Sequence, residues 1–98
     1  RYKQNKTLKG NKMKRIKVHN INNRPNQFLI VAPEGHYFQS YTSLIAFRDN
    51  DNKVFLDVNK WDYSTTTGKY RNIFLNENKK LTLEKIENNT YLLADLNC

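Results

Sequence analysis

The chain has 98 residues and a formal net charge of +8, from 17 basic and nine acidic side chains. This length allows one small domain with a single modest core. No apolar run approaches the roughly 20 residues that cross a bilayer, and the one cysteine, Cys98, has no partner for an internal disulfide. The composition therefore excludes a membrane-spanning or disulfide-stabilised chain and favours a cytoplasmic protein.

The positive charge is concentrated at the N-terminus. Residues 1–17 contain eight basic and no acidic side chains, whereas nine basic and nine acidic side chains cancel from residue 18 onward. The eight are Arg1, Lys3, Lys6, Lys9, Lys12, Lys14, Arg15 and Lys17. We therefore expect a basic tail and lead-in over residues 1–25 and a single, nearly neutral domain over residues 26–98.

The first methionine of the chain is Met13, which follows Lys9-Gly10-Asn11-Lys12. Codons for Lys-Gly can spell a purine-rich ribosome-binding sequence. We therefore expect native translation to begin at Met13, which would remove five of the eight N-terminal basic residues.

Short apolar runs bounded by Pro, Gly, Asn and Asp predict the strands. They cover residues 14–19, 27–32, 36–41, 44–47 and 53–57. Pro33-Glu34-Gly35 and the Asp/Asn-rich residues 48–52 supply turns, and the second of these makes residues 44–57 the best hairpin in the chain. The polar step Ser40–Ser43 predicts a bend or bulge between two strand segments.

A helix is predicted at about residues 66–76. The hydroxyls of Ser64–Thr67 are natural N-caps, and Tyr70, Ile73 and Phe74 share one apolar face at i, i+3 and i+4. Residues 79–94 allow two interpretations, a helix over 79–87 followed by a strand or a hairpin, of which we favour the first. The expected fold is α+β, with an antiparallel sheet of about four or five strands and one or two short helices from the C-terminal half packed on it.

No constellation of catalytic residues is present. His19 and His36 lack metal-ligand spacing, and the glycines are too dispersed for a phosphate loop. Asp57 and Asp62 bracket Trp61, where capping is a better explanation than a carboxylate pair. We therefore expect a protein that is not an enzyme and uses no metal, no cofactor and no small-molecule substrate.

Residues 60–71 are the best candidate for a binding surface, because aromatic, hydroxyl and basic side chains alternate there. Such residues can stack on bases and hold phosphates, and a helix that starts at hydroxyls near a lysine is a generic anion site. The candidate residues, with those of the tail and a second aromatic cluster, are Lys14, Arg15, Lys17, Tyr41, Lys60, Tyr63, Thr66, Lys69 and Arg71. The competing interpretations are core packing for Trp61, Tyr70 and Phe74, and a plain solvated face for Lys69 and Arg71.

A longer pattern extends over about residues 26–97 and leaves the basic tail outside. Its parts are Phe38-Gln39-Ser40-Tyr41, Ile45-Ala46-Phe47, Trp61-Asp62-Tyr63-Ser64, Thr66-Thr67, Lys69-Tyr70-Arg71-Asn72, Phe74-Leu75, Tyr91 and Asp95-Leu96-Asn97. This pattern resembles a family of small uncharacterised proteins from phages and prophages of low-GC Gram-positive bacteria. The resemblance implies a phage or mobile-element protein that acts in the bacterial cytoplasm, and it assigns no catalytic residue.

Two functions follow as expectations. The first is a non-enzymatic phage accessory protein that binds nucleic acid or a nucleoprotein through the tail and residues 60–71. The alternative is a protein-binding inhibitor of a host or anti-phage defence enzyme. The near-neutral body favours the alternative, because nucleic-acid binders usually concentrate charge on the folded surface.

Overall fold

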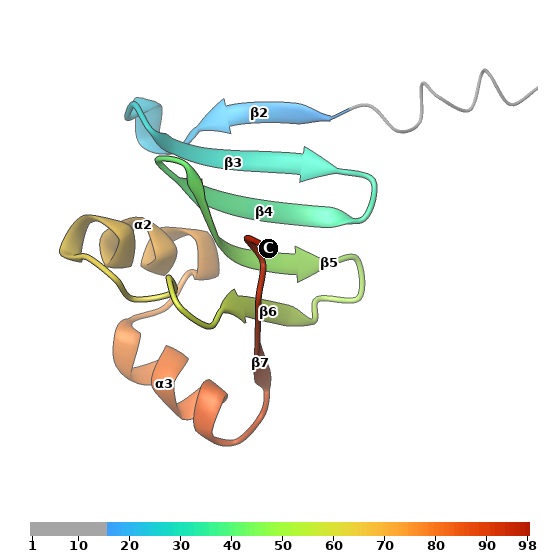
Figure 1. The fold of residues 1–98 in the computed structure, drawn as a ribbon, viewed down its shortest axis with the longest axis vertical. Coiled ribbons are helices and arrows are strands. Elements are labelled where there is room, and N and C mark those ends of the chain that lie inside the picture. Colours follow the sequence, from blue (N-terminus) through green and yellow to red (C-terminus); the bar gives the residue numbers. More distant parts are fainter. Residues whose placement is uncertain (1–15) are drawn as a thin grey trace, which may run out of the picture.

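The computed structural model describes residues 16–98, so the expectations for Met13, Lys14 and Arg15 lie outside the described residues. It has a six-stranded sheet and two α-helices, which confirms the α+β fold (Figure 1). The elements in chain order are β2 (Lys17–Asn20), the short 3-10 helix η2 (Ile21–Asn23), β3 (Gln27–Ala32), β4 (Gly35–Ser40), β5 (Ser43–Asp49), β6 (Val54–Asp57), α2 (Thr65–Leu75), α3 (Lys79–Glu87) and β7 (Tyr91–Ala94).

The sheet follows chain order, and its last pairing is parallel. Strands β2 to β6 form an antiparallel meander, and β7 then pairs with β6 in parallel, with Val54 opposite Tyr91. The prediction of an all-antiparallel sheet is therefore wrong at this edge. The two helices between β6 and β7 carry the chain back to its starting end, as a parallel pairing requires.

With the two edge strands, β2 and β7, the sheet has six strands and not the expected four or five, although both lie in segments where the sequence indicated a strand. The first, β2, pairs with β3 from Lys17 opposite Val31, so the sheet begins within the segment that we assigned to the lead-in. The second is β7, where the structure has helix then strand over residues 79–94 and not a hairpin. The bend predicted at Ser40–Ser43 is a two-residue turn, with Tyr41 at φ 57° and a register shift between Phe38 and Gln39 beside it.

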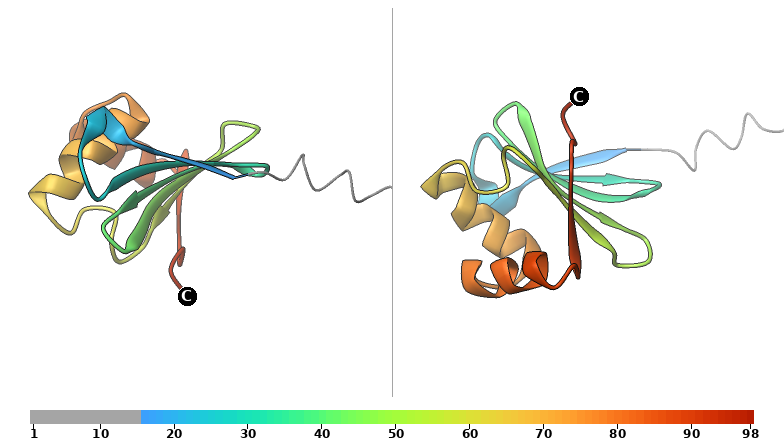
Figure 2. Two further views of the ribbon diagram at one scale, coloured as in Figure 1. Left: turned by 90° about the horizontal axis from the view of Figure 1, so that it is seen from above. Right: turned by 60° about the horizontal axis from the view of Figure 1, so that its bottom comes forward.

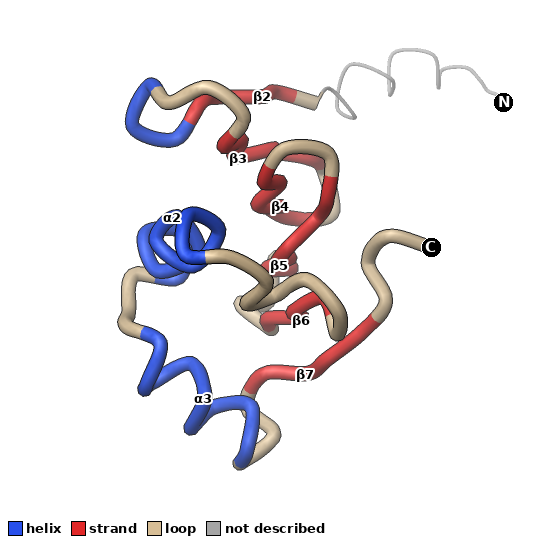
Figure 3. Tube along the Cα trace, turned by 60° about the vertical axis from the view of Figure 1, so that its left-hand side comes forward, coloured by secondary structure: helices blue, strands red, loops and turns tan. Residues whose placement is uncertain are grey.

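The core lies between one face of the sheet and the helices. Both helices lie on the same side of the strands, and the sheet is twisted (Figures 2 and 3). The buried apolar side chains are Phe38, Ile45, Ala46, Val54, Leu56, Tyr70, Leu75 and Tyr91. Trp61 and Phe74 are partly buried against this cluster, as the core-packing interpretation expected. Ile73, which we placed on the apolar face of α2, is instead 42% exposed.

Within residues 16–98, no helix lies on the opposite face of the sheet, and we call this face the open face (Figure 3). Cross-strand register places six apolar side chains in one row across all six strands, namely Val18, Ile30, Tyr37, Phe47, Phe55 and Leu92. The ring centroids of Tyr37 and Phe47 are 4.5 Å apart, and those of Phe47 and Phe55 are 6.1 Å apart.

The residues after β7 run along the same side of the sheet as the open face (Figure 3). There the Asn97 side chain makes two hydrogen bonds to the backbone of Leu44 at the start of β5. The amide of Leu44 donates to Asn97 Oδ1 over 2.7 Å, and Asn97 Nδ2 donates to the Leu44 carbonyl over 2.8 Å. This side chain thus occupies the edge of β5 where β6 no longer pairs.

Two glycines give opposite predictions for alanine substitution. Gly35 has φ 147°, and a Cβ there would overlap the carbonyl oxygen of Arg48, so Gly35→Ala is expected to lower the free energy of unfolding by about 2 kcal/mol or more. Gly68 lies inside α2, where a Cβ would make ordinary contact with Arg71 Nη2 at 3.5 Å. Gly68→Ala is therefore expected to raise stability by up to about 1 kcal/mol, since alanine favours the helix. Urea denaturation of both variants tests the pair, and equal effects would contradict it.

Candidate nucleic-acid interface

The first turn of α2 is fixed by hydroxyl groups, as the sequence predicted. The Ser64 hydroxyl accepts a hydrogen bond from the Thr67 amide over 3.1 Å, which makes Ser64 the N-cap. The Thr67 hydroxyl is buried and lies 3.0 Å from the hydroxyl of Ser40 on β4. These contacts tie the start of α2 to the sheet and leave Lys69 exposed on the outer surface.

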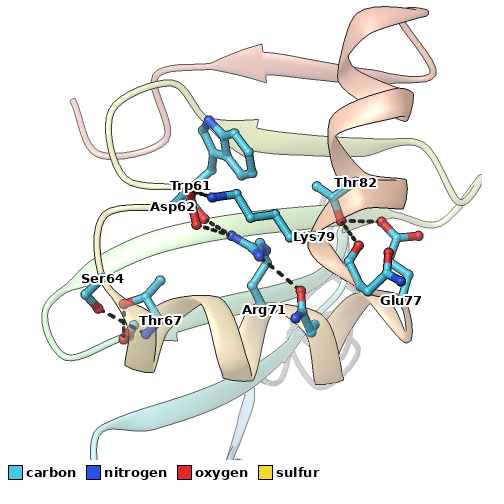
Figure 4. A network of polar contacts seen from close by, with 11 residues as sticks. Trp61, Asp62, Ser64, Thr67, Arg71, Glu77, Lys79 and Thr82 are labelled. Atoms are coloured by element: carbon cyan, nitrogen blue, oxygen red, sulfur yellow. Dashed lines mark hydrogen bonds and ion pairs between the residues drawn. The ribbon is translucent and has the colours of Figure 1, made fainter.

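Arg71 is buried, with 1% of its surface exposed. The sequence suggested either a binding residue or a solvated face, and both interpretations are wrong in expecting an exposed side chain. Its Nη1 donates to the Trp61 carbonyl over 2.8 Å and to Asp62 Oδ1 over 2.9 Å (Figure 4). Its Nη2 donates to Asn72 Oδ1 over 3.0 Å. Arg71 falls on the helix face of Thr67 and Leu75, which is turned inward, and the guanidinium is used within the protein.

Asp62 joins the two helices. Its Oδ1 pairs with Arg71, and its Oδ2 lies 2.6 Å from Nζ of Lys79 at the start of α3 (Figure 4). Partial burial alone would raise the pKa of Asp62, but the hydrogen bonds from Lys79 and Arg71 outweigh it and lower the pKa below the usual value. The carboxylate is therefore ionised at neutral pH and holds both cations in place.

A cleft of about 610 Å³ opens over this network. Its lining contains three basic side chains and one carboxylate, together with hydroxyl and amide groups. The residues are Asp62, Ser64, Thr65, Gly68, Lys69, Arg71, Asn72 and Lys79. The cleft lies beside the first turn of α2, where the helix dipole contributes further partial positive charge. The arrangement attracts anions, and Lys69 and Lys79 are its exposed cations.

The other predicted residues do not gather in this cleft. Lys60 Nζ lies 5.0 Å from the centre of the Tyr63 ring in the preceding loop. Tyr41 and Thr66 line a separate hollow of about 140 Å³, and Lys17 lies on the edge strand β2. Of the candidates predicted from the sequence within the described residues, Lys69 and Arg71 line the cleft, and the others lie outside its lining.

Lys79 lines the cleft but is not among the candidate residues predicted from the sequence. It follows Asn78, whose side chain accepts a hydrogen bond from the Leu81 amide and caps α3. Recognition of this cap would have placed Lys79 in the first turn of a helix. No local pattern indicated that this turn lies against Asp62, because 17 residues separate the two along the chain.

Asp57 is a cap, as the sequence predicted. Its carboxylate accepts hydrogen bonds from the amide of Asn59 over 3.1 Å and the amide of Leu96 over 2.8 Å. Within residues 16–98, no group of three or more His, Cys, Asp or Glu side chains is arranged to hold a metal ion. In the same range, neither helix is long and apolar enough to cross a bilayer.

A second buried network holds the junction between α2 and α3. Only 3% of the Glu77 side chain is exposed, and it accepts hydrogen bonds from the Thr82 hydroxyl over 2.6 Å, Lys85 Nζ over 2.8 Å and the Tyr91 hydroxyl over 2.9 Å. Burial alone would raise the pKa of Glu77, but the three hydrogen bonds lower this pKa by more than burial raises it, so the net shift is downward. Glu77 thereby fixes α3 against β7 and sets the position of Lys79.

The two-layer α+β fold and its cleft define a small protein with a basic candidate site. The chain belongs to a family of unknown function, DUF8033, whose model matches residues 1–89. The match includes the basic N-terminal segment together with the sheet meander and both helices. No curated protein and no solved structure matches the chain.

Arg71 and Lys69 are two basic residues of one helix with opposite roles in stability. Arg71→Ala leaves the Trp61 carbonyl without the guanidinium donor and Asp62 with Lys79 as its remaining cation, and we expect the free energy of unfolding to fall by about 3 kcal/mol. Lys69→Ala changes an exposed side chain and should alter the free energy of unfolding by less than about 0.5 kcal/mol. Urea denaturation compares the two. A stable Arg71→Ala variant would show that the buried network does not hold α2.

Glu77 makes stability depend on acid pH. The pKa of Glu77 is lower in the folded than in the unfolded protein. Its contribution to the free energy of unfolding is therefore fully present above the pKa of the unfolded state and is lost as the pH falls through the pKa of the folded state. We therefore expect the midpoint of thermal unfolding to drop on acidification below about pH 4.5. Glu77→Gln should lower the midpoint at pH 7 and flatten this dependence. An unchanged acid dependence in the variant would assign it to other carboxylates, such as Asp62.

Proposed function

We propose that this chain is a non-enzymatic accessory protein of a phage or mobile element that binds nucleic acid or a nucleoprotein in the bacterial cytoplasm. The observation that supports it is the cleft between the starts of α2 and α3, where three basic side chains face one carboxylate. Lysine ammonium groups and the N-terminal amides of helices are the usual protein contacts for phosphate oxygens. The cleft would hold the sugar-phosphate backbone without reading its sequence.

Within the cleft, the two exposed lysines would contact phosphate, and the buried arginine would position one of them, Lys79. Arg71 orients Asp62, and Asp62 holds Lys79. The hydroxyls of Ser64 and Thr65 at the rim offer further hydrogen bonds to phosphate. Residues 1–15 add seven basic side chains, so we propose that this segment supplies most of the long-range attraction and the cleft supplies a fixed contact.

The lysine pair gives the test of this proposal. Lys69→Ala combined with Lys79→Ala in the full chain removes two phosphate contacts. The slope of log K against log salt for generic single-stranded or duplex nucleic acid should therefore become shallower by about one to two. Fluorescence anisotropy over a range of salt concentrations measures it, and circular dichroism checks that the fold is retained.

Lys53→Ala is the matched control, because Lys53 is an exposed lysine in the turn between β5 and β6 and lies outside the cleft lining. It removes one positive charge, and each single variant, Lys69→Ala or Lys79→Ala, removes the same charge. The proposal expects each cleft variant to weaken binding more than Lys53→Ala. Equal effects of all three would remove the cleft from the binding surface and leave only net charge.

A second candidate function is a protein-binding inhibitor of a host or anti-phage defence enzyme. It is favoured by the open face, over whose row of apolar side chains residues 16–98 place no helix, and by the balance of charges from residue 18 onward. Nuclease treatment of a host lysate before a pull-down separates the two candidates. One stoichiometric host polypeptide retained after nuclease would support inhibition, whereas loss of all bound material would support nucleic-acid binding.

A further inference from the structure

The open face has the composition of a packed interface. None of the six side chains in its cross-strand row carries a charge, and the row crosses the whole sheet. At the two ends of the row, Val18 is 56% exposed and Leu92 is 39% exposed. The four side chains between them are half-buried. An apolar row that remains partly exposed across a whole sheet is typical of an interaction site.

The aromatic side chains in the row are arranged for packing against another apolar layer and not for stacking on bases. Tyr37 and Phe47 stack at 4.5 Å with an angle of 26° between their planes, and Phe47 and Phe55 stack at 6.1 Å with 23°. Phe47 therefore has neighbouring rings on both sides. A base needs a free ring face, so this row offers the edges of rings to an incoming surface.

The two halves of the open face differ in shape. A hollow of about 330 Å³ lies over β2 to β5, and its lining is mostly apolar with two polar side chains: Ile16, Ile30, Ala32, Glu34, Tyr37, Gln39 and Leu44. The rings of Phe47 and Phe55 stand on β5 and β6, and Leu92 on β7. A two-fold axis parallel to the strands at the middle of the face would place the rings of each copy over the hollow of the other.

We propose that the open face binds a second copy of this chain, forming a weak face-to-face dimer. An isologous interface must complement itself. The open face has rings on one half and a hollow on the other, and the one carboxylate in the lining of the hollow, Glu34, is exposed and accepts a hydrogen bond from the Tyr37 hydroxyl over 2.7 Å. Two identical sheets have the same twist, so they can pack in an aligned sandwich. The helices and both basic clefts would then lie on the two outer surfaces.

The expected dimer is weak because the face is small. Six strands about 4.8 Å apart, with roughly 14 to 20 Å of paired length, give about 800 to 1,000 Å² in total when two copies meet. This area is typical of weak and transient protein pairs. Bodies with balanced charge do not repel, and the basic N-terminal segments repel less as salt rises.

Sedimentation velocity of the full, nuclease-treated chain from about 5 μM to 1 mM tests the dimer. We expect a reversible monomer–dimer equilibrium that does not weaken when salt is raised. Because this measurement uses no nucleic acid, its failure leaves the proposed nucleic-acid binding untouched, and the loss of that binding leaves the dimer untouched. A monomer throughout this concentration range would overturn the dimer proposal.

Matched substitutions locate the interface. Leu92→Glu places a charge in the row and should raise the dimer Kd at least tenfold. Leu83→Glu on α3 is the control, because Leu83 is 38% exposed, nearly the same as Leu92, and lies on the helical side of the molecule. Equal effects of the two changes would place the interface elsewhere.

The single cysteine provides a readout that does not require substitution. Cys98 is exposed and follows Asn97, which is bonded to Leu44 at the rim of the open face. One sample carries a nitroxide spin label on Cys98 and no nitrogen-15, and it is mixed with nitrogen-15-labelled protein that has no spin label. In the dimer, the nitroxide of one copy should broaden the amide NMR signals of the sheet strands in the other copy. Broadening confined to the helices would overturn the proposed arrangement.

Discussion

The contact on which the helical layer depends is the buried guanidinium of Arg71. It lies against the Trp61 ring, 5.2 Å from its centre, and donates to the Trp61 carbonyl and to Asp62. One side chain thereby joins α2 to the loop that leaves β6, and through Asp62 and Lys79 it also joins the start of α3. The buried charge is stabilised because Nη1 and Nη2 donate to three acceptors that have fixed positions, whereas the buried Nε has no hydrogen-bond partner among the described residues.

The two faces of the sheet therefore serve different chemistry. On one face the helices complete the core and present a cleft with excess positive charge at their N-terminal turns. On the other face the same strands expose an uncharged row that ends at Val18 and Leu92. A partner that is charged and one that is apolar would each find a separate surface, so the molecule can engage both without competition.

Much of the fold follows from local pattern. The strands, the Ser64 cap and both helices were predicted within a few residues, because short apolar runs and capping side chains are local signals. The parallel position of β7 and the burial of Arg71 were not, since both depend on how distant segments pack. Arg71 lies on the same helix face as Thr67 and Leu75, which is turned inward. Nothing in the local sequence indicates that Asp62, nine positions earlier, pairs with Arg71. Lys69 was placed at the candidate site from sequence, whereas Lys79 required the fold.

The parallel pairing of β6 and β7 bears on the order in which the molecule assembles. The meander from β2 to β6 uses hairpin contacts between neighbours in the chain, which close short loops at little entropic cost. Val54 meets Tyr91 only after both helices are in position, so this contact closes a loop of more than thirty residues. We infer that the meander forms early and that docking of the last strand is the late, slow step. Until then the outer edge of β6 is unprotected and can pair with another chain.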